Sequence, residues 1–242
     1  QLSPLDAPAE LAFKLDDCGA RILITTDLQS LLPQALALLD HGKVDRLIVI
    51  SDADFGPEEA PRMAIPVRPD VVLFGAFSHL CKPAAWPVLR PSDIALLQYT
   101  GGTTGHPKGV ILTHANISSA VGILEIAYGA QIDVKPGEGR ALLVLPLFHI
   151  FAFSAVLMLN LRLGNRISLR MRFVPEAIMA DIERERITHF PGVPTMWIGL
   201  MALPEIEKRD FSSLRFCMSG GAPLPVEVQA RVEGIVGQRL NN

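Results

Sequence analysis

The residues with the clearest chemical potential form one short stretch, which reads Tyr-Thr-Gly-Gly-Thr-Thr-Gly-His-Pro-Lys-Gly-Val over residues 99–110. Glycines allow backbone conformations with positive φ, so successive N–H groups can converge into an anion-binding concavity. The threonine hydroxyls add donors, and the lysine adds a compact positive charge suited to phosphate. The stretch therefore predicts a phosphate-binding loop made of Thr100, Gly101, Gly102, Thr103, Thr104, Gly105 and Lys108.

This loop differs from a P-loop, in which glycine precedes the lysine and serine or threonine follows it. Here Pro107 precedes Lys108 and Gly109 follows it. An exposed Gly/Thr turn is the structural alternative, but glycines, hydroxyls and a lysine occurring together favour a phosphate site. We expect the preceding strand, 94–99, to have parallel character, because ligands of open α/β sheets bind where such strands end.

Strand and helix patterns alternate along the whole chain. Leu11, Leu15 and Cys18 recur at helical spacing, with Asp6 as the expected cap and Gly19 as the expected end. Short Val/Ile/Leu runs suit parallel sheets that are covered on both faces, so the fold class is α/β, with stacked βαβ layers. Further strands are expected at 21–25, 47–50, 71–74, 141–145, 167–169 and 214–218, and helices at 28–39, from about 113, at 175–185 and at 225–236.

A proline-rich connection over residues 51–92 separates two parts of this pattern. We expect one α/β subdomain over 1–91, which includes the connection, and a second over 92–242, which carries the glycine-rich loop. The N-terminus has neither an initiator methionine nor the regions of a signal peptide, so the chain is expected to start within a longer protein.

Composition narrows the function classes. Of the 242 residues, 49% are hydrophobic and the formal net charge is −3, which indicates a folded core and argues against a nucleic-acid-binding surface. Cys18, Cys81 and Cys217 fit no zinc or CxxC spacing, so no metal-ligating residue is assigned and a reducing cytosol is expected. Residues 141–161 carry no charge and could span a bilayer, but Pro146 and Asn160 favour a buried strand followed by a buried helix.

Residues 100–109, Thr-Gly-Gly-Thr-Thr-Gly-His-Pro-Lys-Gly, resemble the signature of the adenylate-forming (AMP-binding) superfamily. This superfamily includes acyl- and aryl-CoA synthetases, peptide-synthetase adenylation domains and firefly luciferase. Most members have serine where this chain has Gly101, so that position is not expected to supply a side-chain ligand. The Gly-Gly form is similar to the bacterial long-chain fatty acyl-CoA synthetase branch.

Further stretches follow in the order of that family. The first, residues 113–116, opens the helix after the loop, and Thr113 is its expected N-cap. Residues 145–153 resemble the motif whose His149 would lie near the acyl carboxylate; a buried core histidine is the structural alternative. The acyl-pocket segment would supply Val193, Pro194 and Thr195, or form an ordinary turn into a helix. The glycine segment against adenine and acyl chain would supply Gly220, Gly221 and Ala222.

The resemblance implies part of the large N-terminal domain of an enzyme that uses ATP, Mg²⁺ and coenzyme A. A carboxylate would attack ATP to give an acyl-adenylate and diphosphate, and coenzyme A would then displace AMP. Thr103, Thr104 and Lys108 would contact the β- and γ-phosphates, with Thr100 as a helper. Lys108, Thr104 and His149 are the expected catalytic residues.

The pocket segments contain no charged residue for a substrate ammonium, which favours an apolar acid, and the Gly-Gly form favours a long-chain fatty acid. An aryl-CoA ligase, an amino-acid adenylation domain, a silent nucleotide- or acyl-binding module and a membrane-embedded protein are the alternatives. The family's remaining motifs would follow residue 242, so the chain alone is expected to be inactive. We expect a cytoplasmic protein with no nucleic-acid partner; peripheral membrane contact and a homodimer are both compatible with this expectation.

Overall fold

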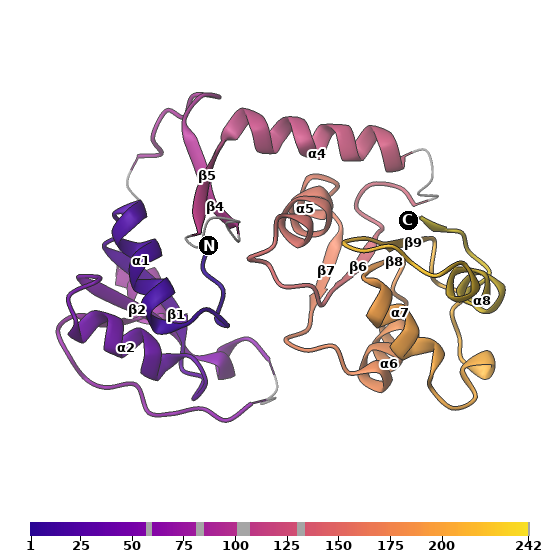
Figure 1. Ribbon diagram of the computed structural model, residues 1–242, viewed down its shortest axis with the longest axis horizontal. Coiled ribbons are helices and arrows are strands. Elements are labelled where there is room, and N and C mark those ends of the chain that lie inside the picture. The colour runs from indigo at the N-terminus through magenta and orange to yellow at the C-terminus, as the bar shows by residue number, and fades with distance from the viewer. Residues whose placement is uncertain (57–59, 81–84, 101–106, 130–133, 242) are drawn as a thin grey trace. The chain divides into compact units, whose positions relative to one another are not determined.

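The computed structural model describes residues 1–56, 60–80, 85–100, 107–129 and 134–241 (Figure 1). The chain forms two compact units, Gln1–Thr113 and His114–Asn242, and each is considered by itself. Both contain parallel β-sheets with helices, which confirms the expected α/β class. The expected division of the chain into subdomains 1–91 and 92–242 stays a prediction.

The first unit is built on a parallel sheet in the order β1-β2-β3. Alternate residues of the central strand, Leu47 and Val49, are fully buried and pack with Leu15 and Leu32 of the neighbouring helices, as expected for period-2 alternation. The elements of this sheet and its helices are α1 (Pro8–Cys18), β1 (Ile22–Thr26), α2 (Leu32–Asp40), β2 (Arg46–Ile50), the 3₁₀ turn η1 (Asp52–Asp54), β3 (Val71–Leu73) and α3 (Phe74–Leu80).

The predicted end of α1 is confirmed and its predicted start is wrong. Gly19 ends the helix in the left-handed region, with φ of 64°. The N-cap is Ala7, without a side-chain cap, because the Asp6 carboxylate is engaged elsewhere. Its Oδ2 accepts from the Lys14 ammonium at 2.7 Å.

An antiparallel hairpin completes the first unit. Strand β4 (Ile94–Thr100) lies where a strand is expected, but it pairs with β5 (Lys108–Thr113), a strand that the sequence analysis did not anticipate. The expected parallel character of the strand before the loop is therefore wrong. No element was predicted for the run Val110-Ile111-Leu112, whose apolar residues pair with β4; two of them are β-branched, which favours a strand.

The second unit contains a five-stranded parallel sheet in the order β10-β9-β8-β6-β7. The chain moves from β6 to β7 on one side and then adds β8, β9 and β10 on the other side of β6. The strand order therefore reverses between β6 and β8, which is where open α/β sheets bind ligands at the carboxyl ends. The strands are β6 (Arg140–Leu143), β7 (Arg166–Leu169), β8 (His189–Gly192), β9 (Phe216–Ser219) and β10 (Leu240–Asn241).

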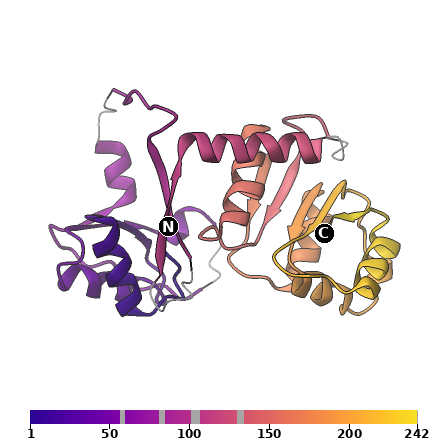
Figure 2. The ribbon, with the colours of Figure 1, turned by 45° about the horizontal axis from the view of Figure 1, so that its top comes forward.

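Helices cover both faces of this sheet (Figures 1 and 2). The π-helix after β6 contacts α4, α5 and β6, while α7 contacts α6 and α8. The core between them contains Leu142, Phe190 and Trp197, all almost fully buried. The helices are α4 (His114–Gly129), the π-helix η2 (Ala152–Met158), α5 (Leu159–Arg162), α6 (Pro175–Glu185), α7 (Pro194–Met201), the 3₁₀ turn η3 (Ile206–Lys208) and α8 (Val226–Val236).

Strand β8 was missed because proline is rare in central strands, where it cannot donate a ladder hydrogen bond. Pro191 is tolerated here, and only Ala141 and His189 pair between β6 and β8. The helix expected after β6 is present, but its segment Ala152–Met158 is π-helical. Among the described residues, no helix is both long and apolar enough to cross a membrane.

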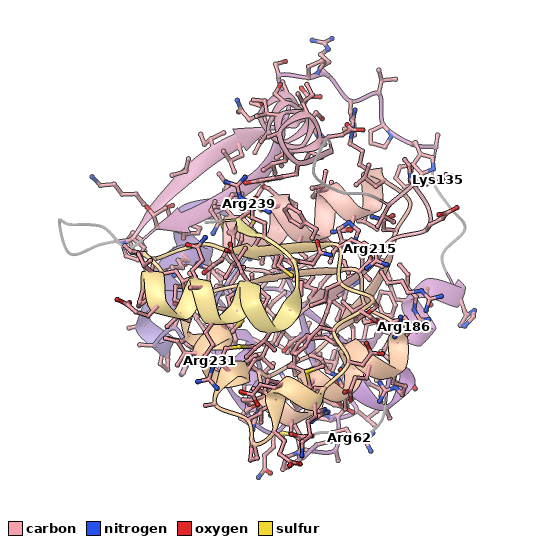
Figure 3. The ribbon with its side chains drawn as sticks, turned by 90° about the vertical axis from the view of Figure 1, so that its right-hand side faces the viewer. Arg62, Lys135, Arg186, Arg215, Arg231 and Arg239 are labelled. Carbon is pink, nitrogen blue, oxygen red and sulfur yellow. The ribbon has the colours of Figure 1, made fainter. Side chains whose placement is uncertain are left out.

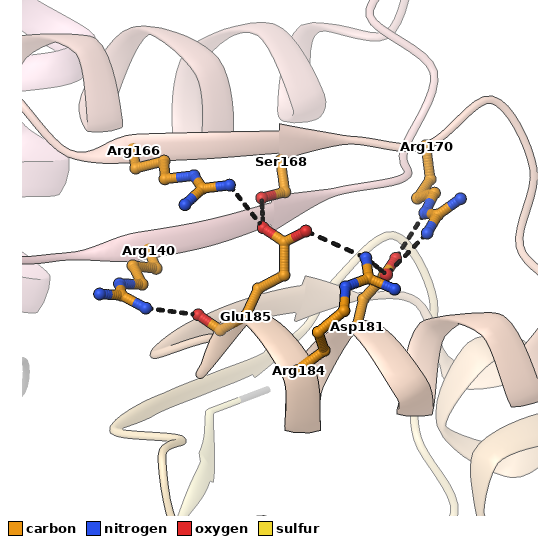
Figure 4. Close-up of polar contacts among 7 residues, drawn as sticks. All are labelled: Arg140, Arg166, Ser168, Arg170, Asp181, Arg184 and Glu185. Carbon is orange, nitrogen blue, oxygen red and sulfur yellow. Dashed lines mark hydrogen bonds and ion pairs between the residues drawn. The ribbon is translucent and has the colours of Figure 1, made fainter. Parts of the chain in front are cut away.

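A network of ion pairs fixes α6 to the edge strand β7 (Figure 4). Asp181 is 2% exposed, and its carboxylate accepts from the guanidinium groups of Arg170 and Arg184. One turn later, Glu185 Oε2 accepts from Arg166 at 2.8 Å and from the Ser168 hydroxyl at 3.0 Å. Hydrogen bonding from Arg184 holds the pKa of Glu185 below its ordinary value.

Histidine 189 should make the second unit less stable in mild acid. The side chain is 4% exposed, and burial lowers its pKa from 6.5 to about 4. Between these values the unfolded chain binds a proton that the folded chain does not, so the free energy of unfolding falls as pH drops from about 6.5 towards 4. The loss should reach roughly 3 kcal/mol.

Urea unfolding at several pH values, followed by the fluorescence of buried Trp197 with exposed Trp86 replaced by phenylalanine, measures this dependence. His189→Gln should flatten the slope between pH 6.5 and 4.5, whereas His149→Gln, at an exposed position, should leave it in place. An unchanged slope in His189→Gln would show that another group titrates.

Candidate functional site

The hairpin holds the two ends of the glycine-rich loop side by side. In the β4–β5 register, Thr100 is paired with Lys108. Directly opposed residues of an antiparallel pair have Cα atoms about 4.5–5.5 Å apart, so both residues lie at the base of the loop. Lys108 is exposed and forms no ion pair with any residue in the described ranges, so its charge faces solvent.

The remaining loop residues predicted to bind phosphate lie outside the described residues. These are Gly101, Gly102, Thr103, Thr104 and Gly105. Their expected contacts with the β- and γ-phosphates stay predictions. Of the predicted phosphate-binding set, the structure therefore places Thr100 and Lys108.

Tyr99 anchors this hairpin to helix α1. Its hydroxyl donates to Asp17 Oδ2 at 2.7 Å and lies 3.1 Å from the Lys14 carbonyl. The Lys14 ammonium lies 5.6 Å from the centre of the ring and pairs with Asp6 and Glu10, both at 2.7 Å. Burial, followed by the bond to Asp17, raises the pKa of Tyr99, so the phenol remains protonated.

Gly109 allows the Tyr99 ring to cross the hairpin. A Cβ at this position would lie 3.2 Å from the ring of Tyr99, its partner in the register. That distance is tighter than ordinary carbon–carbon contact, which is about 3.5–4.0 Å. The glycine after Lys108 thus has a packing role that the sequence motif alone does not reveal.

The second unit gathers the other predicted site residues at one edge of its sheet. Parallel strands end at the same edge, so the segments after β6, β8 and β9 come together there. The first segment carries His149, and the other two supply Val193, Pro194 and Thr195 after β8 and Gly220, Gly221 and Ala222 after β9.

Close contacts join these three segments. A Cβ on Gly220 would lie 3.0 Å from the ring of Phe151, which follows the histidine motif. Gly221 has φ of 82°, and a Cβ there would lie 3.6 Å from Val193 Cγ1. The Gly220 N–H also donates to the Gly192 carbonyl at 3.0 Å. The glycine backbone, Phe151 and Val193 therefore lie together at the carboxyl ends of β6, β8 and β9.

Trp197 holds the predicted acyl-pocket segment against strand β9 and Phe190. Its Nε1 donates to the Met218 carbonyl of β9 at 3.0 Å, and its ring packs edge-on against Phe190 with centroids 5.0 Å apart. A Cβ on Gly192 would lie 3.1 Å from the same Nε1, which explains the glycine. This positioning role of Trp197 was not predicted from the sequence.

His149 lies at the surface of this edge. Its side chain is exposed and its ring packs against Phe148, with centroids 4.8 Å apart. The alternative of a buried core histidine is therefore wrong. Thr195, on the first turn of α7, and Ala222 are also exposed, whereas Pro194 is buried.

Ser219, the last residue of β9, was not anticipated. It is 1% exposed, and its hydroxyl has no hydrogen-bond partner within the described part of the chain. Ser219 directly precedes Gly220, so it lies next to the segment that contacts Phe151. Serine is common before turns, and the sequence offered no sign that this hydroxyl is buried.

No magnesium ligand can be assigned in the described ranges. Among those residues, no group of three or more histidine, cysteine, aspartate or glutamate side chains could hold a metal ion. The loop base, in the first unit, offers hydroxyl and ammonium groups, while the described edge of the second unit offers backbone, apolar side chains and one imidazole. We therefore derive no step through a metal.

The sequence of this chain is similar to those of known CoA ligases. A long-chain-fatty-acid–CoA ligase from Bacillus subtilis is 34% identical over 254 residues, covering 99% of this chain and 44% of the relative. A 4-coumarate-CoA ligase 2 from Narcissus pseudonarcissus is 32% identical over 240 residues, covering 98% and 41%. The chain thus spans less than half the length of these relatives.

The fold is shared with a benzoate CoA ligase from Burkholderia xenovorans LB400. The TM-score is 0.75 at 23% identity, with 99% of this chain and 43% of that chain covered. The AMP-binding enzyme family matches residues 1–242. The chain therefore belongs to the AMP-binding enzyme family.

Proposed function

We propose that the protein containing this chain activates a long-chain fatty acid with ATP and then transfers the acyl group to coenzyme A. The observation that carries the proposal is the hairpin base, where Thr100 is paired with Lys108 and Tyr99 is anchored to α1. Family membership and the fatty-acid-CoA ligase relative support the same reaction class.

In the first half-reaction, a carboxylate oxygen of the acid attacks the α-phosphorus of ATP. The bond from that phosphorus to the bridging oxygen breaks, and diphosphate leaves with the bonding electrons. Because a carboxylate is already ionised at neutral pH, this step needs no general base. It needs in-line positioning and neutralisation of charge on the leaving phosphates, which an exposed ammonium at the base of a loop rich in N–H and hydroxyl donors can supply.

In the second half-reaction, the sulfur of coenzyme A attacks the acyl carbonyl. The bond between that carbon and the AMP oxygen breaks, AMP leaves, and the thiol proton passes to solvent. His149 is exposed beside Phe148, at the edge where Val193 and the glycines meet. We place the acyl carboxylate near this imidazole and the acyl chain along the apolar side chains.

Phe151 and Val193, which supply the described contacts at this edge, carry no charge. An apolar lining suits a hydrocarbon chain and offers no partner for a substrate ammonium. The 4-coumarate-CoA ligase relative keeps an aromatic acid as the second candidate. We also expect the 242-residue chain alone to be nearly inactive, since it corresponds to 44% of the first relative.

The test is to trap the intermediate in the full-length protein. With ATP and a long-chain fatty acid, mass spectrometry should detect the acyl-adenylate, and the thioester should form only after coenzyme A is added. The same incubation with coumarate and benzoate tests the second candidate substrate, an aromatic acid. An adenylate formed only with the aromatic acids would overturn the substrate assignment.

Enlarging Gly220 should weaken binding of the acid. Gly220→Ala places a Cβ about 3.0 Å from the Phe151 ring, so the ring must shift. Overpacking typically costs about 1–3 kcal/mol, so we expect the KM for the acid to rise roughly fivefold or more. Steady-state kinetics with acid varied and ATP saturating measure this. Gly234→Ala, on α8 with open space around it, is the matched control, and an equal KM in the two variants would contradict the assignment.

A further inference from the structure

The opposite edge of the sheet in the second unit carries a second candidate site. We propose that the amino ends of β6, β8 and β9 bind an anion that carries two or more phosphate groups. This inference does not depend on the proposed function, since parallel strands place it at the far edge of the sheet from Val193 and Gly220.

An open pocket of about 440 Å³ lies at this edge. Of the described residues that line it, four are cations, Lys135, Arg140, Arg186 and Arg215, and one is a carboxylate, Glu138. Figure 3 shows Lys135, Arg215 and Arg186 on the same side of the sheet. A chain with a net charge of −3 thus concentrates positive charge in one concave place, which favours a polyanion.

Backbone hydrogen bonds hold two of these arginines on either side of Thr188, the residue that precedes the intervening strand β8. The Thr188 N–H donates to the Arg140 carbonyl at 2.9 Å, and the Arg215 N–H donates to the Thr188 carbonyl at 2.8 Å. The Arg140 N–H donates in turn to Thr188 Oγ1 at 2.8 Å. The bases of both side chains are therefore set by the sheet itself.

No carboxylate of a described residue forms an ion pair with Arg140 or Arg215. Arg140 Nη1 donates to the Glu185 carbonyl at 2.8 Å, and Arg215 Nη1 donates to the Ser212 carbonyl at 2.6 Å. Neither arginine has an ion pair with a residue that the structure describes, whereas Arg186 pairs with Asp210 at 2.7 Å. Guanidinium groups held in this way by neutral acceptors keep donors for phosphate oxygens.

Ser213 gives an independent sign of a ligand. It lines the same pocket and is 5% exposed, and its Oγ has no hydrogen-bond partner in the described ranges. A buried hydroxyl without a partner is unfavourable, and such groups call for an explanation. A phosphate oxygen in the pocket would pair with it. A single carboxylate would use one arginine, so several cations fit a diphosphate better.

Calorimetric titration of inorganic diphosphate tests the site, both in the 242-residue chain and in the full-length protein. All titrations use a Lys108→Gln background, which removes the charge of the loop. Replacing both Arg140 and Arg215 by glutamine should weaken binding about 100-fold, since a hydrogen bond to a charged group is worth roughly tenfold each. Arg231→Gln with Arg239→Gln, elsewhere in the unit, is the matched control and should bind as the background does.

Absence of saturable binding in the Lys108→Gln background would overturn the site, and so would equal affinities of the two double variants. Trp197 fluorescence verifies that each variant is folded. Ser213→Ala should weaken binding several-fold without lowering stability, because its hydroxyl has no hydrogen-bond partner among the described residues. Orthophosphate and AMP should bind more weakly than diphosphate. Equal affinity for either of them would contradict the proposal that the ligand carries two or more phosphate groups.

Discussion

Replacing Lys108 by alanine in the full-length protein should lower acid-dependent ATP–diphosphate exchange by about 10²–10³-fold. The reason is electrostatic, because the exposed ammonium at the loop base is expected to neutralise charge on the leaving phosphates, and one well-placed donor in such a site is typically worth that factor. The loss should appear in kcat more than in the KM for the acid, since the charge develops on the phosphates in the transition state.

Lys208→Ala provides the control, because Lys208 is an exposed lysine that pairs with Glu205 on the surface of the second unit. It should leave the exchange rate close to that of the unmodified protein. Thermal unfolding of Lys108→Ala should match the unmodified protein, since Lys108 forms no ion pair with a described residue. An exchange rate for Lys108→Ala within a few-fold of the control would contradict the role of this lysine.

Asp181→Asn should destabilise the second unit by about 3–5 kcal/mol. Asp181 is 2% exposed and accepts from both Arg170 and Arg184, so its replacement removes a buried carboxylate that two guanidinium groups share. The free energy of unfolding, measured by urea titration with Trp197 fluorescence, gives the value.

Two variants make this result interpretable. Asp181→Leu combined with Arg170→Met removes both charges and keeps apolar volume, so it should be far less destabilising than Asp181→Asn. Glu205→Ala breaks an exposed pair and should change stability little. If Asp181→Asn proved no worse than Glu205→Ala, the network in Figure 4 would not stabilise the attachment of α6 to β7.

Sequence patterns predicted those elements whose formation depends on neighbouring residues in the chain. Helix α6 spans the predicted residues 175–185, because Pro175 favours the first turn and the apolar positions repeat at helical spacing. Strands β8 and β5 were missed for different reasons. Pro191 contradicts the usual rule for a central strand. The segment of β5 was not predicted to be a strand, so its pairing with β4 could not be predicted either.

The sequence predicted which residues belong to the candidate site better than it predicted their contacts. The motif identified Thr100 and Lys108, but their direct pairing follows from a hairpin that was not expected. Spacing could not show that Phe151 meets Gly220 or that Val193 meets Gly221, because these contacts join segments far apart in the sequence. Tyr99 and Trp197 position the site through hydrogen bonds to Asp17 and to the Met218 carbonyl, which lie far from them in the sequence. Such tertiary partners have no sequence signature.

The most direct test of the proposed activity is acid-dependent ATP–diphosphate exchange by the full-length protein. The panel should contain short, medium and long fatty acids, benzoates and amino acids. The account predicts rapid exchange with a long-chain fatty acid, slower exchange with aromatic acids and none with amino acids. A folded protein that binds ATP but exchanges diphosphate with none of these acids would contradict it and favour a nucleotide-binding module without ligase activity.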